Sequence, residues 1–301
     1  MDKKTEYHST TFAKDLQTLY KWAQQWRVTF NAKKTEYMIF SYKNKQPNYP
    51  ALYLGNQPIS LVKKHTHLGI TFDPKMTWKE HISNVSKKAN QRLSNIKRIR
   101  HVIPRKVADN LYKSLVRPVM EYGNILFDNM SQILAKEIEQ VQREAMVMIT
   151  QAYRRTPTSK LHLETGLLPM KGRCREQRLI LYYKIANNLT PDYLKALLPK
   201  QINTNVQYNL RNSRQLRIPL AKTTKYSISF ILQTSRDWND LDEQIRESSS
   251  VEIFKANLNI STKVNPNKLF SSFATTENKH LTRIRLGLSP LKQHLHDFHI
   301  I

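Results

Sequence analysis

The chain has 301 residues, and its 49 Lys and Arg against 23 Asp and Glu give a formal net charge of +26 and a pI near 10.1. A hydrophobic fraction of 40% is too high for a disordered chain and sufficient for two domains with cores. The single cysteine, Cys174, excludes an internal disulfide, and no run of 18 apolar residues could span a membrane. The charge favours nucleic acid as the partner over a generally basic protein with another role. A charged start without a signal-peptide core predicts an intracellular location, nuclear or cytoplasmic, with no membrane partner.

The first 78 residues predict one helix and several short strands. Apolar residues recur at helical spacing over 13–26, which indicates an amphipathic helix. Strands are expected over 37–42, 52–54, 59–62 and 68–72. Because Gly55 and Asn56 adopt positive φ at little cost, the two middle strands should form a hairpin.

A long basic helix follows. From His81 to Ala108 the chain has eight Lys or Arg residues and no Asp or Glu. One apolar face is formed at three- and four-residue steps by Ile82, Val85, Ala89, Leu93, Ile96 and Ile103. The cations that fall largely off that face are Lys87, Lys88, Arg92 and Arg98. Such a helix suits contact with a nucleic-acid backbone, and the alternatives are a solvated charged face or a membrane-surface helix. Eight neutralised phosphates would give a salt slope of roughly −7.

The remaining pattern is mostly helical. Helices are expected over 105–117 and 132–152, from Thr158 or Ser159, over 173–185 with a basic face, and after a cap at Ser248–Ser250. Residues 200–226 are interpreted as a linker or exposed loop. Glu121 can pair with Arg117, and Trp238 is interpreted as a core residue in preference to a base-stacking platform. The histidines of the last eight residues have no cysteine nearby, so no zinc site is predicted.

Two spaced segments carry a resemblance to a known family. The first is Trp22-Ala-Gln-Gln-Trp26-Arg-Val-Thr-Phe30-Asn31-Ala-Lys33-Lys34-Thr35, and the second is His67-Leu68-Gly69-Ile70-Thr71-Phe72-Asp73 followed by Trp78 and His81. Together they resemble the last two polymerase motifs of a non-LTR (LINE-type, jockey-like) retrotransposon reverse transcriptase. The later frames Arg117-Pro118-x-x-Glu121-Tyr122-Gly123 and Trp238-Asn239-Asp240-Leu241 are similar to the same family.

The resemblance implies an α+β fold that is mostly α. A remnant of the polymerase palm, made of a helix plus small antiparallel hairpins, would be followed by a helical thumb and a helical C-terminal region. The expected segments are 1–78 for the end of the palm with a primer-grip-like hairpin, 79–155 for the thumb-like region, 156–258 for the C-terminal region and 259–301 for a basic tail.

The resemblance also implies roles for particular residues. Lys34 matches the lysine beside the incoming triphosphate, where it would act as general acid or triphosphate contact, although Lys33 is a competing neighbour. Leu68 and Gly69 match the primer-gripping hairpin, where a glycine lets the backbone approach a strand closely. A solvated lysine in a turn and a glycine at a bulge are the structural alternatives. The basic helix would contact the template–primer backbone without reading sequence.

Catalysis in the parent enzymes requires Mg²⁺ held by aspartates. This sequence contains no Asp-Asp pair, and it predicts no metal site and no cofactor of its own. The expected function is therefore that of a fragment of an RNA-directed DNA polymerase from a mobile element, which binds nucleic acid without polymerising. The alternatives are a stand-alone basic nucleic-acid-binding protein derived from such an element, and a polymerase whose missing N-terminal segment comes from another chain or an upstream exon.

Overall fold

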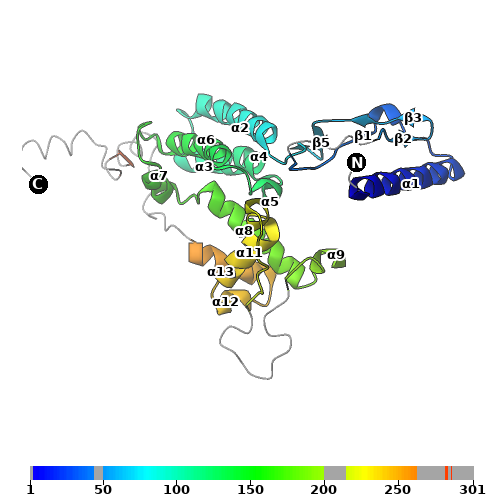
Figure 1. The fold of residues 1–301 in the computed structure, drawn as a ribbon. Coiled ribbons are helices and arrows are strands. Elements are labelled where there is room, and N and C mark those ends of the chain that lie inside the picture. The colour runs from blue at the N-terminus through cyan, green and yellow to red at the C-terminus, as the bar shows by residue number, and fades with distance from the viewer. Residues whose placement is uncertain (1–2, 44–49, 200–214, 263–281, 284–285, 287–301) are drawn as a thin grey trace, which may run out of the picture. The chain divides into compact units, whose positions relative to one another are not determined.

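The computed structural model describes residues 3–43, 50–199, 215–262, 282–283 and 286 (Figure 1). The chain divides into two compact units, residues 1–81 and 82–301, and each is described by itself. Most described residues are helical, and the strands form small two-stranded sheets. The α+β class with mostly α content is thereby confirmed.

Unit 1 contains one long helix and short strands. Helix α1 spans Lys3–Gln25, so it begins ten residues before the predicted start at residue 13. The strands are β1 (Glu36–Tyr37), β2 (Tyr53–Leu54), β3 (Gln57–Pro58), β4 (Ser60–Leu61), β5 (His65–His67) and β6 (Ile70–Phe72). A 3₁₀ turn, η1 (Ala32–Lys34), precedes β1. The sheets are antiparallel β2–β3 and β5–β6 hairpins and a parallel β1–β4 pair, which the sequence did not indicate.

The β2–β3 hairpin confirms the predicted Gly55-Asn56 turn, but its second strand is β3 and not the predicted 59–62, of which Ser60 and Leu61 pair with β1. Tyr53 pairs with Pro58 and Leu54 with Gln57, and Ile59 N donates to Leu52 O over 2.9 Å. Gly55 has a φ of 62° and lies beneath the ring of Tyr20 from α1. A Cβ at residue 55 would lie 2.5 Å from Tyr20 Cζ, so the absence of a side chain lets α1 pack on this hairpin.

The segment after β6 is organised by one carboxylate. Asp73 Oδ2 accepts hydrogen bonds from Thr77 N over 2.8 Å and Trp78 N over 3.1 Å, while Asp73 Oδ1 accepts one from Lys75 N over 3.0 Å. These bonds hold Trp78, which is 1% exposed, at a φ of 65° that bulky residues rarely adopt. His81 Nδ1 accepts from Thr71 N over 3.3 Å. Asp73, Trp78 and His81 of the second motif therefore have structural roles.

Unit 2 is a set of packed helices. Helix α2 (Lys79–Ile99) starts in unit 1. It is followed by α3 (Arg105–Leu111), the π-helix η2 (Tyr112–Val116), α4 (Arg117–Glu121), α5 (Asn124–Phe127), α6 (Gln132–Thr150) and α7 (Thr158–Thr165). The remaining helices are α8 (Met170–Ala186), α9 (Asp192–Lys195), α10 (Thr224–Ser227), α11 (Phe230–Asn239), α12 (Glu243–Arg246) and α13 (Val251–Thr262). In Figure 1, α8 runs from the group of α3 and α6 to α11 and α13, and it packs against α6, α11 and α13.

Three helix boundaries differ from the prediction. Helix α2 ends at Ile99, four residues before Ile103, and α8 begins at Met170, three residues before residue 173. The predicted helix over 105–117 continues to Glu121 through a π-helical turn that ends at Val116, two residues before Pro118. Proline lacks an N–H and its ring clashes with the carbonyl four residues earlier, so a wider turn accommodates it.

The C-terminal part of unit 2 has an aromatic core. The rings of Tyr182 and Trp238 lie 4.8 Å apart, and those of Tyr183 and Phe254 lie 4.5 Å apart. Trp238 is 8% exposed, which confirms its predicted place in the core. Ser250 Oγ accepts from Ile253 N over 3.2 Å, which confirms the expected cap of α13.

The basic face predicted for α8 is instead used inside the protein. Arg173 pairs with Glu121 over 2.8 Å, and Arg175 and Arg178 pair with Asp237 over 3.1 and 2.5 Å. The predicted Arg117–Glu121 pair is present at 3.6 Å. These arginines join α8 to α4 and α11, so they are not available as an external cationic surface.

The first expected segment boundary lies close to the division between the two units, and the later segments do not form separate units. The boundary expected after residue 78 lies three residues from the division after residue 81. Residues 79–155 and 156–258 share unit 2 almost entirely. Residues 200–214 of the expected linker and most of the expected tail, including its histidines, lie outside the described residues.

Candidate nucleic-acid interface

Helix α2 presents a polar face without acid beyond its first turn. Its buried side is formed by Ile82, Val85, Ala89, Leu93 and Ile96, each at most 7% exposed. Lys87, Lys88, Arg92 and Arg98 are exposed on the same helix, as predicted, and the structure brings these four residues together on one element. The apolar periodicity of 3.6 residues determines this arrangement because it fixes which side of the helix faces the core.

Several cations of the 81–108 segment are already bonded. Arg92 Nη1 donates to Leu115 O in η2 over 2.7 Å, and Lys97 Nζ lies 2.6 Å from Glu144 Oε2. Arg105 pairs with Glu164 over 2.6 Å. Arg92 is thus partly a structural residue that holds the π-helical turn, which sequence reasoning did not indicate.

Arg100 is buried at the end of α6. Its Nε donates to Met148 O over 2.9 Å, its Nη2 to Ile149 O over 2.9 Å, and its Nη1 to Ile103 O over 2.7 Å. Burial lowers the pKa of Arg100, and the positive charge of Arg105 lowers it further. Arg100 therefore caps the carbonyl end of α6, where a cation is stabilised by the helix dipole.

Lys87, Lys88 and Arg98 make no recorded hydrogen bond or ion pair with the described residues. Lys87 and Arg98 are eleven residues apart, which is three helical turns, so they point in nearly the same direction about 16 Å apart along the axis. At 3.4 Å per nucleotide, that distance corresponds to about five steps of a nucleic-acid strand. These three cations are the part of the predicted surface that is available to phosphates.

The predicted site residues of unit 1 lie in two turns. Lys34 ends η1, where it is exposed and its N–H donates to Asn31 O over 3.0 Å. Leu68 and Gly69 form the two-residue turn between β5 and β6, with φ values of 47° and 80°. Leu68 is 76% exposed at the tip of this hairpin. The pair lies in the turn between two strands and not, as expected, within a strand over 68–72.

A contact joins these two regions of unit 1. Glu36 Oε2, two residues after Lys34, lies 3.0 Å from His65 Nδ1 at the start of β5. Both side chains are partly exposed, so the pair contributes little to stability. It nevertheless joins β1, which follows the Asn31-x-x-Lys34 turn, to the first strand of the β5–β6 hairpin.

The described residues offer no metal centre. No group of three or more His, Cys, Asp or Glu side chains among them is placed to hold a metal ion.

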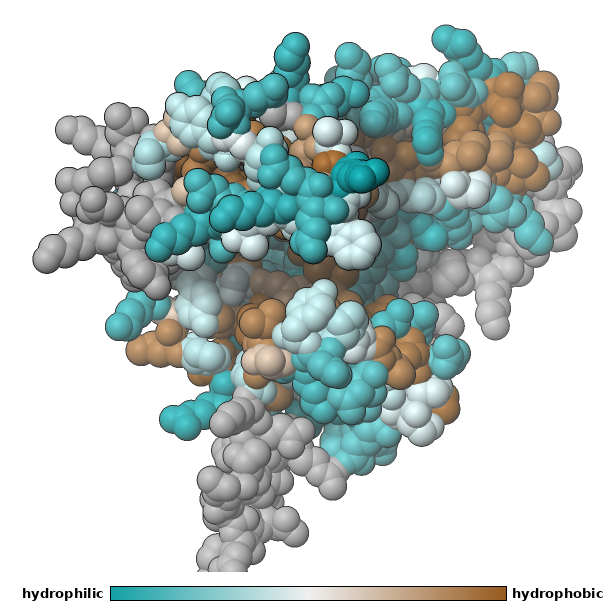
Figure 2. Space-filling model, turned by 90° about the vertical axis from the view of Figure 1, so that its right-hand side faces the viewer, coloured by the Kyte–Doolittle hydropathy of each residue, from teal (hydrophilic) through white to brown (hydrophobic). Residues whose placement is uncertain are grey.

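The surface is mixed in character. Figure 2 shows hydrophobic side chains at the surface among hydrophilic ones. In α1 and directly after it, the exposed large side chains include Phe12, Leu19, Trp22 and Trp26, each about half or more exposed. No described helix combines the length and the apolar character that crossing a membrane requires.

Comparison with known proteins supports the resemblance carried by the two motifs. The chain is 25% identical over 209 residues to the RNA-directed DNA polymerase from mobile element jockey of Drosophila melanogaster, covering 67% of this chain and 22% of the relative. It is 21% identical over 134 residues to the probable RNA-directed DNA polymerase from transposon X-element of the same organism, covering 43% of this chain and 14% of the relative. No protein-family model matches the chain, and no solved structure matches it.

Proposed function

We propose that this chain, which is similar to part of the RNA-directed DNA polymerases of non-LTR mobile elements, binds the backbone of a template–primer duplex through the exposed cations of α2. The observation that carries the proposal is the outer face of α2, which has no acid beyond the first turn and on which Lys87, Lys88 and Arg98 are unbonded to the described residues. Phosphate contacts of this kind position a strand without reading its sequence. Residues 79–155 would act as a thumb-like region followed by a helical C-terminal region, and the protein would be nuclear or cytoplasmic.

The α2 surface can be tested with matched variants of equal charge. The triple variant Lys87→Gln, Lys88→Gln, Arg98→Gln removes three charges from α2 and leaves Arg92 to hold η2. The control Lys171→Gln, Lys222→Gln, Lys255→Gln removes three exposed lysines from other parts of unit 2. Affinity for a labelled RNA–DNA duplex at about 0.1 M salt should fall about tenfold or more in the first variant and about twofold in the control.

Equal losses in the two variants would mean that the net charge of the whole chain, and not α2, attracts nucleic acid. Loss of the same size on unrelated duplex sequences is also expected, because the contacts are to phosphates. If the loss of affinity of the α2 variant depended on the base sequence of the duplex, backbone contact would be contradicted.

We further propose that the chain does not extend a primer by itself, since catalysis would need carboxylates that hold magnesium. Supplying the purified chain with primer–template, magnesium and nucleotides should give binding without extension. Extension would overturn this part of the proposal. Lys34 would then be the first residue to replace, because it matches the triphosphate-contacting lysine of the family.

The β5–β6 turn is proposed to touch the primer strand. An exposed leucine at positive φ is unusual and costly, which suggests that the position has a role beyond folding. Leu68→Asn suits the same backbone conformation and removes the apolar tip. Weaker duplex binding at unchanged stability would support contact, whereas unchanged binding would assign Leu68 a purely structural position.

A further inference from the structure

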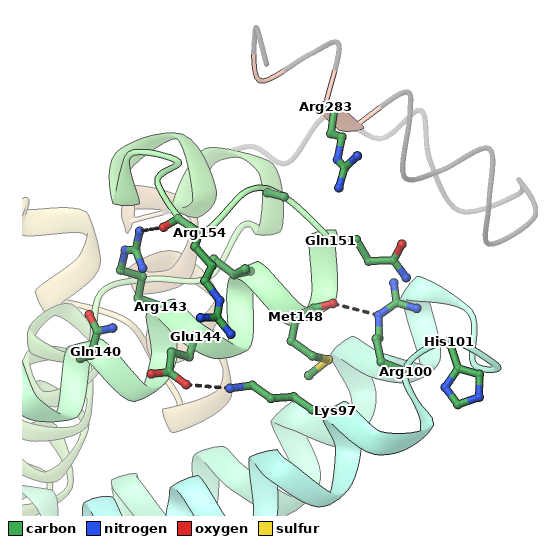
Figure 3. Close-up of a pocket in the computed structure, with 12 residues that line it drawn as sticks. Lys97, Arg100, His101, Gln140, Arg143, Glu144, Met148, Gln151, Arg154 and Arg283 are labelled. Carbon is green, nitrogen blue, oxygen red and sulfur yellow. Dashed lines mark hydrogen bonds and ion pairs between the residues drawn. The ribbon is translucent and has the colours of Figure 1, made fainter. Parts of the chain in front are cut away.

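A large cavity lies where α2 and α6 end (Figure 3). Its volume of about 790 Å³ is in the range of small-molecule sites. Its polar lining is formed by Lys97, Arg100, His101, Gln140, Arg143, Glu144, Gln151, Arg154 and Arg283. All of these residues belong to unit 2, so the cavity is formed within one compact unit.

The charge around this cavity is strongly unbalanced. Five of the lining residues are Lys or Arg, and Glu144 is the one carboxylate among the described residues that line it. That carboxylate is engaged by Lys97 over 2.6 Å. The remaining four guanidinium groups therefore surround the cavity without a described acid to neutralise them.

Two of the four arginines are held in place by neutral acceptors. Arg100 donates to the carbonyls of Met148 and Ile149, and Arg143 Nη2 donates to the carbonyls of Arg154 and, over 3.3 Å, Thr156. A carbonyl satisfies an N–H group but does not neutralise the charge. These two arginines thus build a rigid positive wall.

The other two arginines keep donors available. Arg154 has no recorded hydrogen bond or ion pair from its guanidinium to the described residues, and the same is true of the His101 ring. The Arg283 guanidinium carbon lies 4.2 Å from the ring centroid of Tyr153, and its buried Nε has no hydrogen-bond partner among the described residues. Figure 3 shows Arg283 entering from the side opposite Lys97.

We propose that this cavity binds a phosphate group, with Arg154, Arg283 and His101 as its donors. A planar guanidinium presents paired N–H groups that match phosphate oxygens, and a phosphate carries the negative charge that the surrounding wall lacks. Lys97 lines the cavity one residue before the exposed Arg98, so the cavity adjoins the last turn of the α2 surface.

The phosphate can come from a nucleic-acid strand that continues past α2 or from a free polyphosphate. The strand version rests on the proposed function, and the free-polyphosphate version does not. Two probes separate them: inorganic pyrophosphate and a ten-nucleotide single-stranded DNA, each titrated calorimetrically into the full chain.

The loop after α6 supplies a matched pair of variants. Arg154→Gln removes a cavity donor, whereas Arg155→Gln removes an adjacent exposed arginine that does not line the cavity. The dissociation constant of at least one probe should rise about tenfold in Arg154→Gln and less than about twofold in Arg155→Gln, because charge-assisted hydrogen bonds are lost in the first variant alone. His101→Gln, which leaves the arginines untouched, should weaken the same probe.

The probe that loses affinity identifies the source of the phosphate. A selective loss for the DNA makes the ligand a strand phosphate, and a selective loss for pyrophosphate makes it a free polyphosphate. The inference would be overturned if each probe bound the Arg154→Gln and Arg155→Gln variants with the same affinity. It would also be overturned if neither probe bound the native chain. The α2 triple variant judges the proposed function separately, since it leaves every cavity residue in place.

Discussion

The charged residues of unit 2 divide according to whether the fold uses their charge. Arg178 is 3% exposed and forms ion pairs with Asp128 and Asp237. Lys87 and Arg98 are exposed and unbonded to described residues, although all of these side chains count equally in the net charge. Burial decides which charges are used internally, because a buried charge must be paired within the protein whereas an exposed charge can interact with a binding partner.

Arg178 gives the first prediction. Arg178→Met leaves the carboxylates of Asp128 and Asp237 without their shared cation, and the free energy of unfolding should fall by about 3 kcal/mol. Urea denaturation followed by circular dichroism measures this. Arg155→Met, at an exposed position, should change stability by less than about 0.5 kcal/mol. Similar values for the two variants would contradict a structural role for the buried ion pairs.

His162 makes stability depend on pH. Its Nδ1 lies 2.6 Å from Leu167 O and its Nε2 lies 3.1 Å from Glu139 Oε1, so both ring nitrogens face acceptors. Burial lowers the pKa of His162, but the hydrogen bonds to Glu139 and Leu167 outweigh burial and raise it overall. The protonated ring therefore stabilises the folded chain.

The sign of the pH effect follows from the raised pKa. The contribution of His162 should be complete below the unfolded pKa of about 6.5 and should be lost as pH rises through the higher folded pKa. Urea midpoints of the native chain and of His162→Gln, measured from pH 5.5 to 8.5, should converge as pH increases. A constant difference between them would rule out a charged His162.

At the scale of elements, small local features decide how helices and hairpins join. Gly55 lets Tyr20 of α1 cover the β2–β3 turn, Asp73 forms the turn before α2, and Arg92 holds the π-helical turn that precedes Pro118. Each joins segments that the hydrophobic pattern predicted separately. The pattern locates elements, whereas these contacts fix their mutual geometry within a unit.

Gly55→Ala should disrupt unit 1. The new Cβ would meet the Tyr20 ring at 2.5 Å, and alanine disfavours a φ of 62°. The free energy of unfolding of unit 1 should fall by about 1–3 kcal/mol, detectable as a lower denaturant midpoint in tryptophan fluorescence. The double variant Gly55→Ala, Tyr20→Ala keeps the backbone strain but removes the clash. If the clash is the cause, adding Gly55→Ala to Tyr20→Ala should lower the free energy of unfolding by less than Gly55→Ala lowers it in the native chain. An equal loss in the two backgrounds would mean that backbone strain, and not packing, is the cause.

At the scale of the whole molecule, a net charge of +26 overstates the cations that can meet phosphates. Of the eight cations between His81 and Ala108, at least Arg92, Lys97, Arg100 and Arg105 have partners within the protein. Lys87, Lys88 and Arg98 give a salt slope of roughly −3 for duplex DNA, and two cavity arginines would bring it to roughly −5. Binding measured from 50 to 300 mM salt should give a slope in this interval. A slope near −7 would mean that further cations, either exposed elsewhere on the chain or released from internal pairs, also meet phosphates.

The sequence predicted most of the elements and only some of the site. Apolar periodicity located α2, α6 and α8 to within a few residues, and the Gly55-Asn56 signal located a hairpin correctly. It missed the first ten residues of α1. It also missed the π-helix and the parallel β1–β4 pair, because contacts between segments distant in sequence, such as that of Arg92 with Leu115 O, stabilise them more than local preference does. It placed Lys87, Lys88, Arg92 and Arg98 on the exposed side of α2 but could not distinguish Arg92 from the other three. Arg154 and Arg283 were missed because residues 129 positions apart give no periodic signal.

What the sequence by itself determined is the partner class that the charge favours, the mostly helical content and the resemblance to mobile-element polymerases, since composition, periodicity and short motifs are local properties. The tertiary structure alone decided which cations are internal and which remain exposed. It also decided that the arginines of α8 face Glu121 and Asp237, and that the ends of α2 and α6 enclose a basic cavity. The physical reason is that pairing and burial depend on which distant segments meet, and those meetings follow from packing the apolar faces together.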